Sequence, residues 1–221
     1  MNFFTRQGRT LLLAAVLAVG AVCWAGCVTG TEPEGGGGNN CGTDGTDGSC
    51  KTTVIGGQTW LAENLNYQTG NSWCYNDSSS YCRKYGRLYD WETAKTACQA
   101  VGWRLPDTTD WRILVDAAGG YDGAGKKLRS KGGWEENWIP YSGTDDFGFS
   151  ALPGGMANAQ SMAGGGDRMT FKGVGYNGNW WTTTEGTDGY FVHGLGMSYN
   201  NYSVGPSNGY KGYGYSVRCI R

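Results

Sequence analysis

A Trp-Arg-Leu-Pro turn between two amphipathic segments constrains the fold of this 221-residue chain more than any other feature. Pro106 disfavours helical backbone at the residue before it, so an upstream helix must end before this point. Asp107 then predicts a helix start, because its carboxylate can accept from the free N–H groups of a first turn. Asp110, three residues later, can reach back in a capping-box-like way. The sequence therefore predicts a helix that starts after Asp107 and ends at Gly119 and Gly120.

Another helix is predicted just upstream of this turn, over Trp91–Ala100. In both helices the apolar residues recur at helical spacing and share one face. These faces comprise Trp91, Ala94 and Cys98 in the first helix, and Trp111, Leu114, Val115 and Ala118 in the second. The two helices therefore meet at the turn, and the glycine-rich remainder of the chain must pack on them.

Short strands are predicted around the helices. Two runs with strand-like composition flank Gly56 and Gly57, which predicts a hairpin of Thr52–Ile55 and Gln58–Leu61. The expected fold class is α+β, with two helices packed on short, irregular antiparallel sheets. Further patterns predict a polar loop over residues 74–82, strands at 85–89 and 149–152, and one antiparallel sheet of residues 180–183, 190–197 and 213–220.

Composition indicates a single loop-rich domain. The chain has 40 glycines, and 14 % of its residues are aromatic. Many glycines with many large rings are typical of an irregular core built from aromatic side chains, and disordered chains are poor in such rings. The 18 basic and 19 acidic residues nearly cancel, so no nucleic-acid partner is expected.

The N-terminal region predicts export. Residues 1–26 combine Arg6 and Arg9 with an apolar run over residues 11–22, which is typical of a signal peptide and too short to span a bilayer. Cys27 follows two small residues, as in a lipobox, so we expect it to be acylated; the alternative is an ordinary cleaved signal. Residues 27–40 then form a flexible, lipid-anchored linker, and residues 41–221 the domain. The expected location is the outer membrane or cell surface.

Six cysteines follow the leader and its Cys27: Cys41, Cys50, Cys74, Cys82, Cys98 and Cys219. An even number in an exported chain predicts disulfides, although six cysteines allow 15 pairings. Zinc binding is disfavoured, because the sequence has no Cys-x-x-Cys and only one histidine, His193.

Several motifs in order resemble the FISUMP domain, the Fibrobacter succinogenes major paralogous domain. They are GQTWLAENLNY at 57–67, YGRLY at 85–89, GWRLP at 102–106, GFSALPGG at 148–155, WWTT at 180–183 and YSVRC at 215–219. The resemblance covers residues 54–221. It implies a fold related to C-type-lectin-like and formylglycine-generating-enzyme-like domains, and with the cysteine spacing it favours the pairs Cys41–Cys50, Cys74–Cys82 and Cys98–Cys219. It implies no particular activity.

The chemistry of those related folds is not carried over. Formylglycine-generating relatives use a redox-active cysteine pair near the C-terminus, whereas this chain has only Cys219 there. The Trp-Asn-Asp signature of calcium-dependent lectins is missing, and Glu32-Pro33-Glu34 lies in the linker. Asp44 and Asp47 stand in a turn-rich loop without EF-hand spacing. No metal and no cofactor are therefore expected.

An enzyme is not expected either. The acidic residues of the segment after the second helix, Glu135, Glu136, Asp145 and Asp146, lie in one loop, where adjacent acids usually face solvent. His193 is the only candidate base of a Ser-His-Asp arrangement. The basic run at residues 126–131 is interpreted as a solvated helix face.

A non-catalytic binding module remains the leading hypothesis, with a polysaccharide as the expected ligand. Sugars present C–H faces that stack on aromatic rings, while asparagine holds their hydroxyls. The candidate contacts are Trp134, Trp138, Tyr141, Tyr176, Asn177, Asn179, Tyr199, Asn200, Asn201 and Tyr202, whereas Trp60, Trp103, Trp111, Trp180 and Trp181 are expected in the core. For the loop rings, binding and packing stay open. The alternatives are a structural or protein-interaction module of the cell envelope and, third, a glycan hydrolase.

Overall fold

The computed structural model describes Cys41 and residues 50–136, 143–161 and 167–221. Its helices are η1 (Tyr75–Asp77), α1 (Ser79–Tyr85), α2 (Trp91–Ala100), α3 (Thr108–Ala117) and α4 (Ala124–Leu128). Its strands are β1 (Thr52–Ile55), β2 (Gln58–Leu61), β3 (Ser72–Trp73), β4 (Leu88–Tyr89), β5 (Met156–Ser161), β6 (Asp167–Lys172), β7 (Asn177–Glu185), β8 (Phe191–Ser198), β9 (Val204–Pro206) and β10 (Gly209–Tyr210). The described part is thus α+β with short antiparallel sheets, as the sequence predicts.

Local sequence signals set the two central helices. The Asp107 carboxylate accepts from the Asp110 N–H at 2.8 Å, and Asp110 accepts from the Asp107 N–H at 2.8 Å, so α3 begins with a full capping box. Asp90 caps α2 in the same manner through the Thr93 N–H at 2.8 Å. Gly119 and Gly120 have φ of +109° and +86°, a conformation that ends the helix and favours glycine.

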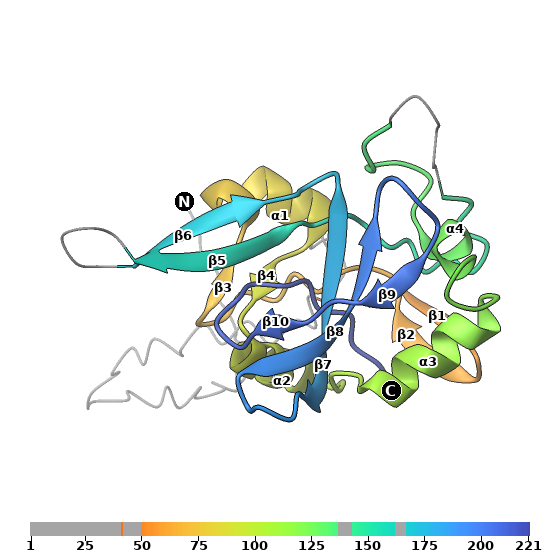
Figure 1. Ribbon diagram of the computed structural model, residues 1–221, viewed down its shortest axis with the longest axis horizontal. Coiled ribbons are helices and arrows are strands. Elements are labelled where there is room, and N and C mark those ends of the chain that lie inside the picture. The colour runs from red at the N-terminus through yellow and green to blue at the C-terminus, as the bar shows by residue number, and fades with distance from the viewer. Residues whose placement is uncertain (1–40, 42–49, 137–142, 162–166) are drawn as a thin grey trace, which may run out of the picture. The chain divides into compact units, whose positions relative to one another are not determined.

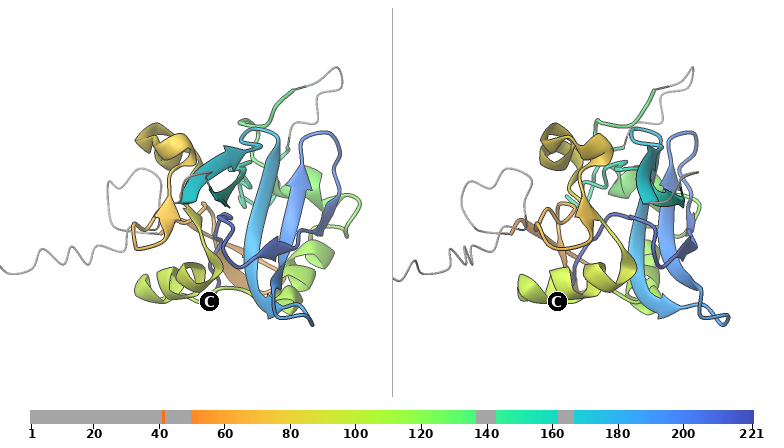
Figure 2. Two further views of the ribbon diagram at one scale, coloured as in Figure 1. Left: turned by 60° about the vertical axis from the view of Figure 1, so that its left-hand side comes forward. Right: turned by 90° about the vertical axis from the view of Figure 1, so that its left-hand side faces the viewer.

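The largest sheet places β8 at its centre. Strand β7 pairs with one edge of β8, and β9 and β10 pair with different parts of β8 (Figure 1). Two-stranded ladders of β1–β2, β3–β4 and β5–β6 complete the pairing. In the right-hand view of Figure 2, β7 and β8 lie on one side of the domain, and α1 and α2 lie on the other. The face of β7 and β8 that points away from α1 and α2 is therefore not covered by these two helices.

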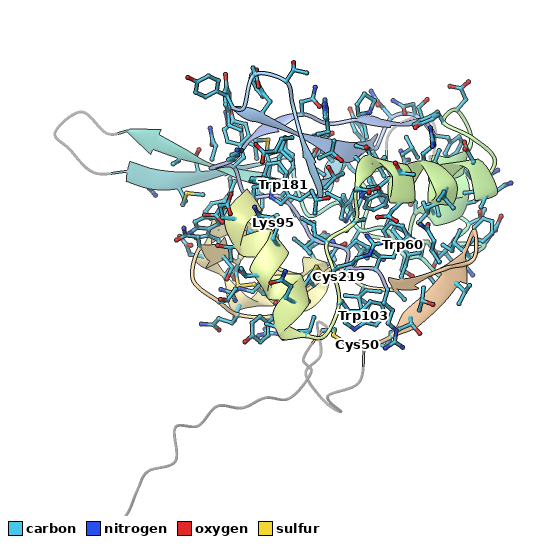
Figure 3. All side chains as sticks on the ribbon, turned by 90° about the horizontal axis from the view of Figure 1, so that it is seen from below. Cys50, Trp60, Lys95, Trp103, Trp181 and Cys219 are labelled. Atoms are coloured by element: carbon cyan, nitrogen blue, oxygen red, sulfur yellow. A yellow bond between two sulfur atoms is a disulfide. The ribbon has the colours of Figure 1, made fainter. Side chains whose placement is uncertain are left out.

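Consecutive tryptophans of β7 bind the sheet to both halves of the core. Because neighbouring side chains on a strand point to opposite faces, Trp180 and Trp181 enter different clusters. Trp181 stacks on Tyr215 with ring centroids 4.3 Å apart. The ring of Trp180 lies 6.3 Å from that of Trp111, which in turn lies 4.7 Å from the ring of Trp60. Trp60 belongs to strand β2 and is labelled in Figure 3. All five tryptophans predicted as core residues are buried.

The C-terminal segment corrects one strand prediction. Residues 213–220 do not join the β7–β8 sheet as an antiparallel strand, but make isolated bridges. Ser216 pairs in parallel with Trp180, and Tyr215 and Ile220 pair with other elements. Residues 214–220 are buried throughout, because this segment runs between the hairpins and shares its backbone hydrogen bonds among them.

Three further predictions were wrong in detail. Tyr85 ends helix α1 instead of starting a strand, and the strand there is only Leu88–Tyr89. The predicted polar loop at residues 74–82 contains η1 and most of α1, whose short polar sequence buries only Cys82 and Tyr85. Residues 149–152 form no strand; Ala151 makes a single parallel bridge to Arg129.

Three disulfides staple the described residues, and they are the pairs that the resemblance favours: Cys41–Cys50, Cys74–Cys82 and Cys98–Cys219. The bond between Cys98 on α2 and Cys219 closes a separation of 121 residues, and Figure 3 shows Cys219 in the interior.

Arg218 is a buried hub that sequence reasoning did not single out. Its guanidinium donates to Asn64 Oδ1 at 2.9 Å, to the Leu61 carbonyl at 3.1 Å and to the carbonyls of Phe149 and Ser150. Burial lowers the pKa of Arg218 to about 9. The arginine of the YSVRC motif therefore joins three loops of the core.

Within the described ranges, no helix is both long and apolar enough to cross a membrane.

Candidate functional site

A polar groove lies on one face of strands β7, β8 and β9. The register pairs Asn177 with Ser198, Asn179 with Gly196, and Gly196 with Gly205, so these side chains share a face. Two facing glycines, Gly196 and Gly205, contribute no side chain here; Ser207 lies close to Gly196, whereas the space over Gly205 is open. We call the hollow the amide groove; it has a volume of about 290 Å³ and is lined by Asn177, Asn179, Gly196, Met197, Ser198, Asn201, Ser203, Gly205, Pro206 and Ser207.

Hydrogen bonds within the amide groove hold its side chains in place. Ser207 Oγ donates to Asn179 Oδ1 at 2.8 Å, and the Ser203 N–H donates to Asn201 Oδ1 at 2.9 Å. The Nδ2 group of Asn179 has no hydrogen-bond partner among the described residues. The groove therefore presents oriented amide donors to solvent.

A pair of contacting tyrosines lies just beyond the ends of β7 and β8 that carry the amide groove. Tyr176 precedes β7 and Tyr199 follows β8, and the Tyr199 N–H donates to the Tyr176 carbonyl at 2.8 Å. Their ring centroids are 5.0 Å apart with an interplanar angle of 81°. Tyr176 is 43 % exposed. Neither ring is among the residues that line the groove, and Tyr199 packs against the core cluster that contains Trp180 and Met197.

Buried Arg129 supports the turn that carries the groove's rim. Its guanidinium donates to the carbonyls of Ser198 and Asn201, and it lies 4.4 Å from the ring of Trp134 and 5.8 Å from that of Tyr202. Burial lowers the pKa of Arg129 to about 10. The basic run at residues 126–131 is thus not wholly a solvated face, because its arginine is fully buried.

Trp134, for which the sequence left binding and packing open, is a packing residue in the structure. It is only 7 % exposed, and its Nε1 donates to the Ala151 carbonyl at 3.0 Å. Its ring lies 4.4 Å from the guanidinium of buried Arg129, and this cation–π contact favours the inward position. Trp138 and Tyr141, predicted with it, lie outside the described residues.

A second hollow lies between α1 and the backbone around Trp134. We call it the α1 cleft; it has a volume of about 550 Å³ and is lined by Ser80, Tyr81, Lys84, Tyr85, Gly133, Trp134, Glu135, Val174 and Gly175. Tyr85 is 6 % exposed, yet its hydroxyl has no hydrogen-bond partner in the part of the chain that the structure describes. Since Tyr85 lines the cleft, its residual exposure is toward this hollow.

The predicted acidic residues do not converge on a base. Asp145 accepts from Ser150 N–H at 2.7 Å and from Ser150 Oγ at 2.6 Å, so it stabilises a turn. His193 Nδ1 lies 2.9 Å from Asn208 Oδ1. His193 borders a separate, mainly apolar pocket of about 240 Å³ between α3 and β8. Over the described ranges, no cluster of three His, Cys, Asp or Glu side chains is placed to hold a metal ion.

The structure thus brings together part of the predicted set. Asn177, Asn179 and Asn201 line the amide groove, and exposed Asn200 accepts from Ser198 Oγ at 3.0 Å beside it. Tyr176 and Tyr199 contact each other but do not line the groove. Half-buried Tyr202 packs under the rim against Arg129. Sequence reasoning missed the glycine floor and the three serines. Glycine and asparagine alternate with buried residues along β7 and β8, and this alternation could have indicated a polar face of the sheet.

Comparison with known proteins gives one match. The Fibrobacter succinogenes major domain matches residues 54–221. No curated protein matches the chain. No solved structure matches it either.

Proposed function

The chain belongs to the Fibrobacter succinogenes major domain family, and from that premise we propose that its domain is a non-catalytic binding module for a neutral polysaccharide. The family match covers the described core but brings no curated relative from which a ligand can be taken. The proposal therefore depends on the chemistry of the amide groove.

The observation that carries the proposal is the combination of fixed amides and hydroxyls around a hollow whose open side includes Gly205. Asn177, Asn179 and Asn201 offer donors and acceptors for sugar hydroxyls. A Cβ added at Gly205 would meet no atom within 4 Å, so a sugar can approach the sheet there.

Charge supports a neutral ligand. None of the ten groove-lining residues is ionisable. A carboxylate or phosphate group would lose solvation on entering the groove without gaining a counter-charge from its walls. Neutral hexose and pentose polymers are therefore favoured over acidic polysaccharides.

Filling the groove floor tests the proposal. A Cβ added at Gly205 meets no atom within 4 Å, so Gly205→Val should fold normally and occupy the groove with a branched side chain. The matched control is Gly212→Val, because Gly212 is also open and lies outside the groove. We expect the wild type and Gly212→Val to bind neutral glycans on an array and insoluble polysaccharides in pull-downs, and Gly205→Val to lose at least tenfold in affinity. Equal binding by Gly205→Val contradicts the groove as the site.

Export and anchoring are part of the same proposal. The apolar run and Cys27 support a lipoprotein at the outer membrane or cell surface, with residues 27–40 as the tether. Labelling cells with a palmitate analogue should mark the wild type and not Cys27→Ala. Equal labelling of both would favour an ordinary cleaved signal.

A kinship with C-type-lectin-like and formylglycine-generating-enzyme-like folds is also proposed. It is supported by the tie between a central helix and the C-terminal segment through Cys98–Cys219, together with several short sheets. An experimental structure compared with both fold groups would test it.

A protein-interaction role is the second candidate, and one observation favours it. Tyr190 is 74 % exposed, and the neighbouring Phe191 and Tyr210 rings lie 4.2 Å apart on the surface. If glycans do not bind, crosslinking from Tyr190 in intact cell envelopes should identify a protein partner. A glycan hydrolase is the third candidate, and turnover of model glycosides tests it.

A further inference from the structure

We infer that a second binding site lies on the face of β8 that turns toward α3, and that it takes a small aryl-alkylamine. The aromatic ring of this ligand enters an apolar pocket, and its ammonium group enters an acidic hollow beside that pocket. Both hollows have His193 in their linings, so they adjoin and one ligand can reach both. The site is separate from the amide groove and does not depend on the proposed glycan.

A row of side chains along β8 connects the two hollows. Alternate residues of a strand share a face, so Phe191, His193 and Leu195 point to the same side, about 7 Å apart from one to the next. Gly196, which lines the amide groove, belongs to the opposite face. The neighbouring segment continues the row with Pro206 opposite Leu195, Asn208 beside His193 and Tyr210 opposite Phe191.

The first hollow is the apolar pocket where α3 covers this row, and we call it the α3 pocket. It has a volume of about 240 Å³, and Trp111, Tyr121, Leu195 and Pro206 supply its apolar walls. Trp111 is 2 % exposed, whereas Tyr121 is 47 % exposed and therefore forms the wall nearest to solvent. A pocket of this size lies below the usual range for drug-sized ligands and suits a single aromatic ring.

The second hollow, which we call the turn hollow, lies beside the turn between β7 and β8. It has a volume of about 330 Å³ and is lined by Gly186, Thr187, Asp188, Phe191, His193 and Asn208. Asp188 Oδ1 accepts from the Phe191 N–H at 3.1 Å and from the Tyr190 N–H at 3.0 Å, and these bonds hold the pKa of Asp188 below its ordinary value. Asp188 Oδ2 has no hydrogen-bond partner among the described residues, so one charged oxygen is left for a ligand.

His193 adds an acceptor where the two hollows meet. Because an amide oxygen only accepts, the bond to Asn208 Oδ1 places the hydrogen on Nδ1, and Nε2 of the neutral ring is left as an acceptor. Among the described residues that line the two hollows, Asp188 is the one carboxylate, and no lysine or arginine is present. An ammonium group thus meets two acceptors and an opposite charge, whereas a carboxylate would meet repulsion.

Three matched probes test the end group that the site prefers. Phenethylamine, phenethyl alcohol and phenylacetate share the ring and the chain length, and they differ in whether the end is cationic, neutral or anionic. Ligand-observed NMR titration of the full chain measures their affinities. We expect the amine to bind at least about tenfold tighter than the alcohol, because a charge-assisted hydrogen bond is stronger than a neutral one, and the acid to bind more weakly than either.

Two substitutions then address the two hollows separately. Tyr121→Ala removes the outer wall of the α3 pocket and should weaken amine binding at least about fivefold, whereas Tyr190→Ala, outside both linings, should not. Asp188→Asn keeps the oxygen that the two backbone N–H groups use and removes the charge, so the amine should lose its advantage over the alcohol. Its control, Asp116→Asn, lies on α3 outside both linings and should keep that advantage. Near-UV circular dichroism verifies that each variant is folded.

The inference is overturned if phenethylamine does not bind, or if the three probes bind equally. It is also overturned if Tyr121→Ala and Asp188→Asn both keep the wild-type affinity for the amine. Gly205→Val should bind the amine as the wild type does, because Gly205 and its partner Gly196 line the amide groove. Loss of amine binding in Gly205→Val would place the amine in that groove and refute the second site. None of these outcomes depends on whether a glycan binds.

Discussion

Replacing Trp134 with alanine should lower the free energy of unfolding by about 3–5 kcal/mol, the usual range for losing a buried tryptophan. The ring is 7 % exposed, and the guanidinium carbon of Arg129 lies 4.4 Å from its centroid. A cation–π contact away from water contributes on the order of 2 kcal/mol. The expected loss therefore combines a cavity with the loss of the nearer of the two rings that the Arg129 guanidinium approaches.

The hydrogen bond of the Trp134 indole contributes little to this loss. Its acceptor, the Ala151 carbonyl, also accepts from Ser130 N–H at 3.1 Å and from Ser130 Oγ at 3.0 Å. The carbonyl thus stays paired in the variant, and no buried acceptor is left without a donor. Most of the effect should come from the ring itself.

Urea denaturation followed by far-UV circular dichroism measures the effect. Trp134→Phe keeps a ring over Arg129 and should lose only about 1–2 kcal/mol. Tyr190→Ala removes a ring that is 74 % exposed and should stay within about 0.5 kcal/mol of the wild type. If Trp134→Ala also stays within about 0.5 kcal/mol, the ring does not support the fold and the hypothesis of an exposed loop ring returns.

Three other perturbations test the fold that holds the site. Replacing Cys98 and Cys219 together with serine should cost about 4–5 kcal/mol on the chain-entropy account, because their bond closes a separation of 121 residues, and non-reducing peptide mapping should recover that pair. Arg104 holds the pKa of Asp110 below its ordinary value, so this carboxylate stabilises the fold above about pH 4 and the effect is lost as pH falls through its folded pKa. Acid titration of unfolding should therefore be less steep for Asp110→Asn than for the wild type, and equal slopes would contradict this. Arg218→Met should lose about 3–5 kcal/mol in urea denaturation, because the carbonyls of Leu61, Phe149 and Ser150 lose a buried donor, while Asn64 Oδ1 keeps the bond from Trp180 Nε1; a loss below about 1 kcal/mol would contradict that role.

The parts of the fold that could be predicted from sequence are those set by short-range rules. Asp107 and Asp110 are three residues apart and cap the same helix turn, so their roles follow from spacing alone. The β1–β2 hairpin was predicted for the same reason, since Gly56 and Gly57 adopt the positive φ that its turn requires. In these cases the partners are neighbours in the chain.

The parts that could not be predicted depend on distant partners. Residues 213–220 have strand-like composition, but Ser216 pairs with Trp180 in a parallel bridge and Ile220 with Trp60, which no local pattern specifies. Helix α1 was missed because its stability comes partly from the Cys74–Cys82 bond and from burial of Tyr85, and its exposed residues are mostly polar.

In the candidate site, too, features that depend on residue type could be predicted, and features that depend on distant partners could not. Asparagine and tyrosine near the ends of β7 and β8 could be identified from composition, because these residue types suit sugar contacts. That Gly196 faces Gly205 could not, since it depends on the register between two strands. Those two glycines convert a row of polar side chains into a groove.

Trp134 and the groove are linked through Arg129, and this link changes how binding data must be interpreted. Arg129 donates to the carbonyls of Ser198 and Asn201, which carry the rim of the amide groove, and its guanidinium also lies against the Trp134 ring. Without that ring the Arg129 side chain is less tightly packed. The turn over residues 198–201, whose carbonyls it binds, should then become less ordered. Trp134→Ala should then weaken glycan binding even though Trp134 lies outside the groove lining. A loss of binding in that variant alone is therefore no sign of a sugar stacked on Trp134, whereas Gly205→Val alters the groove without touching this support.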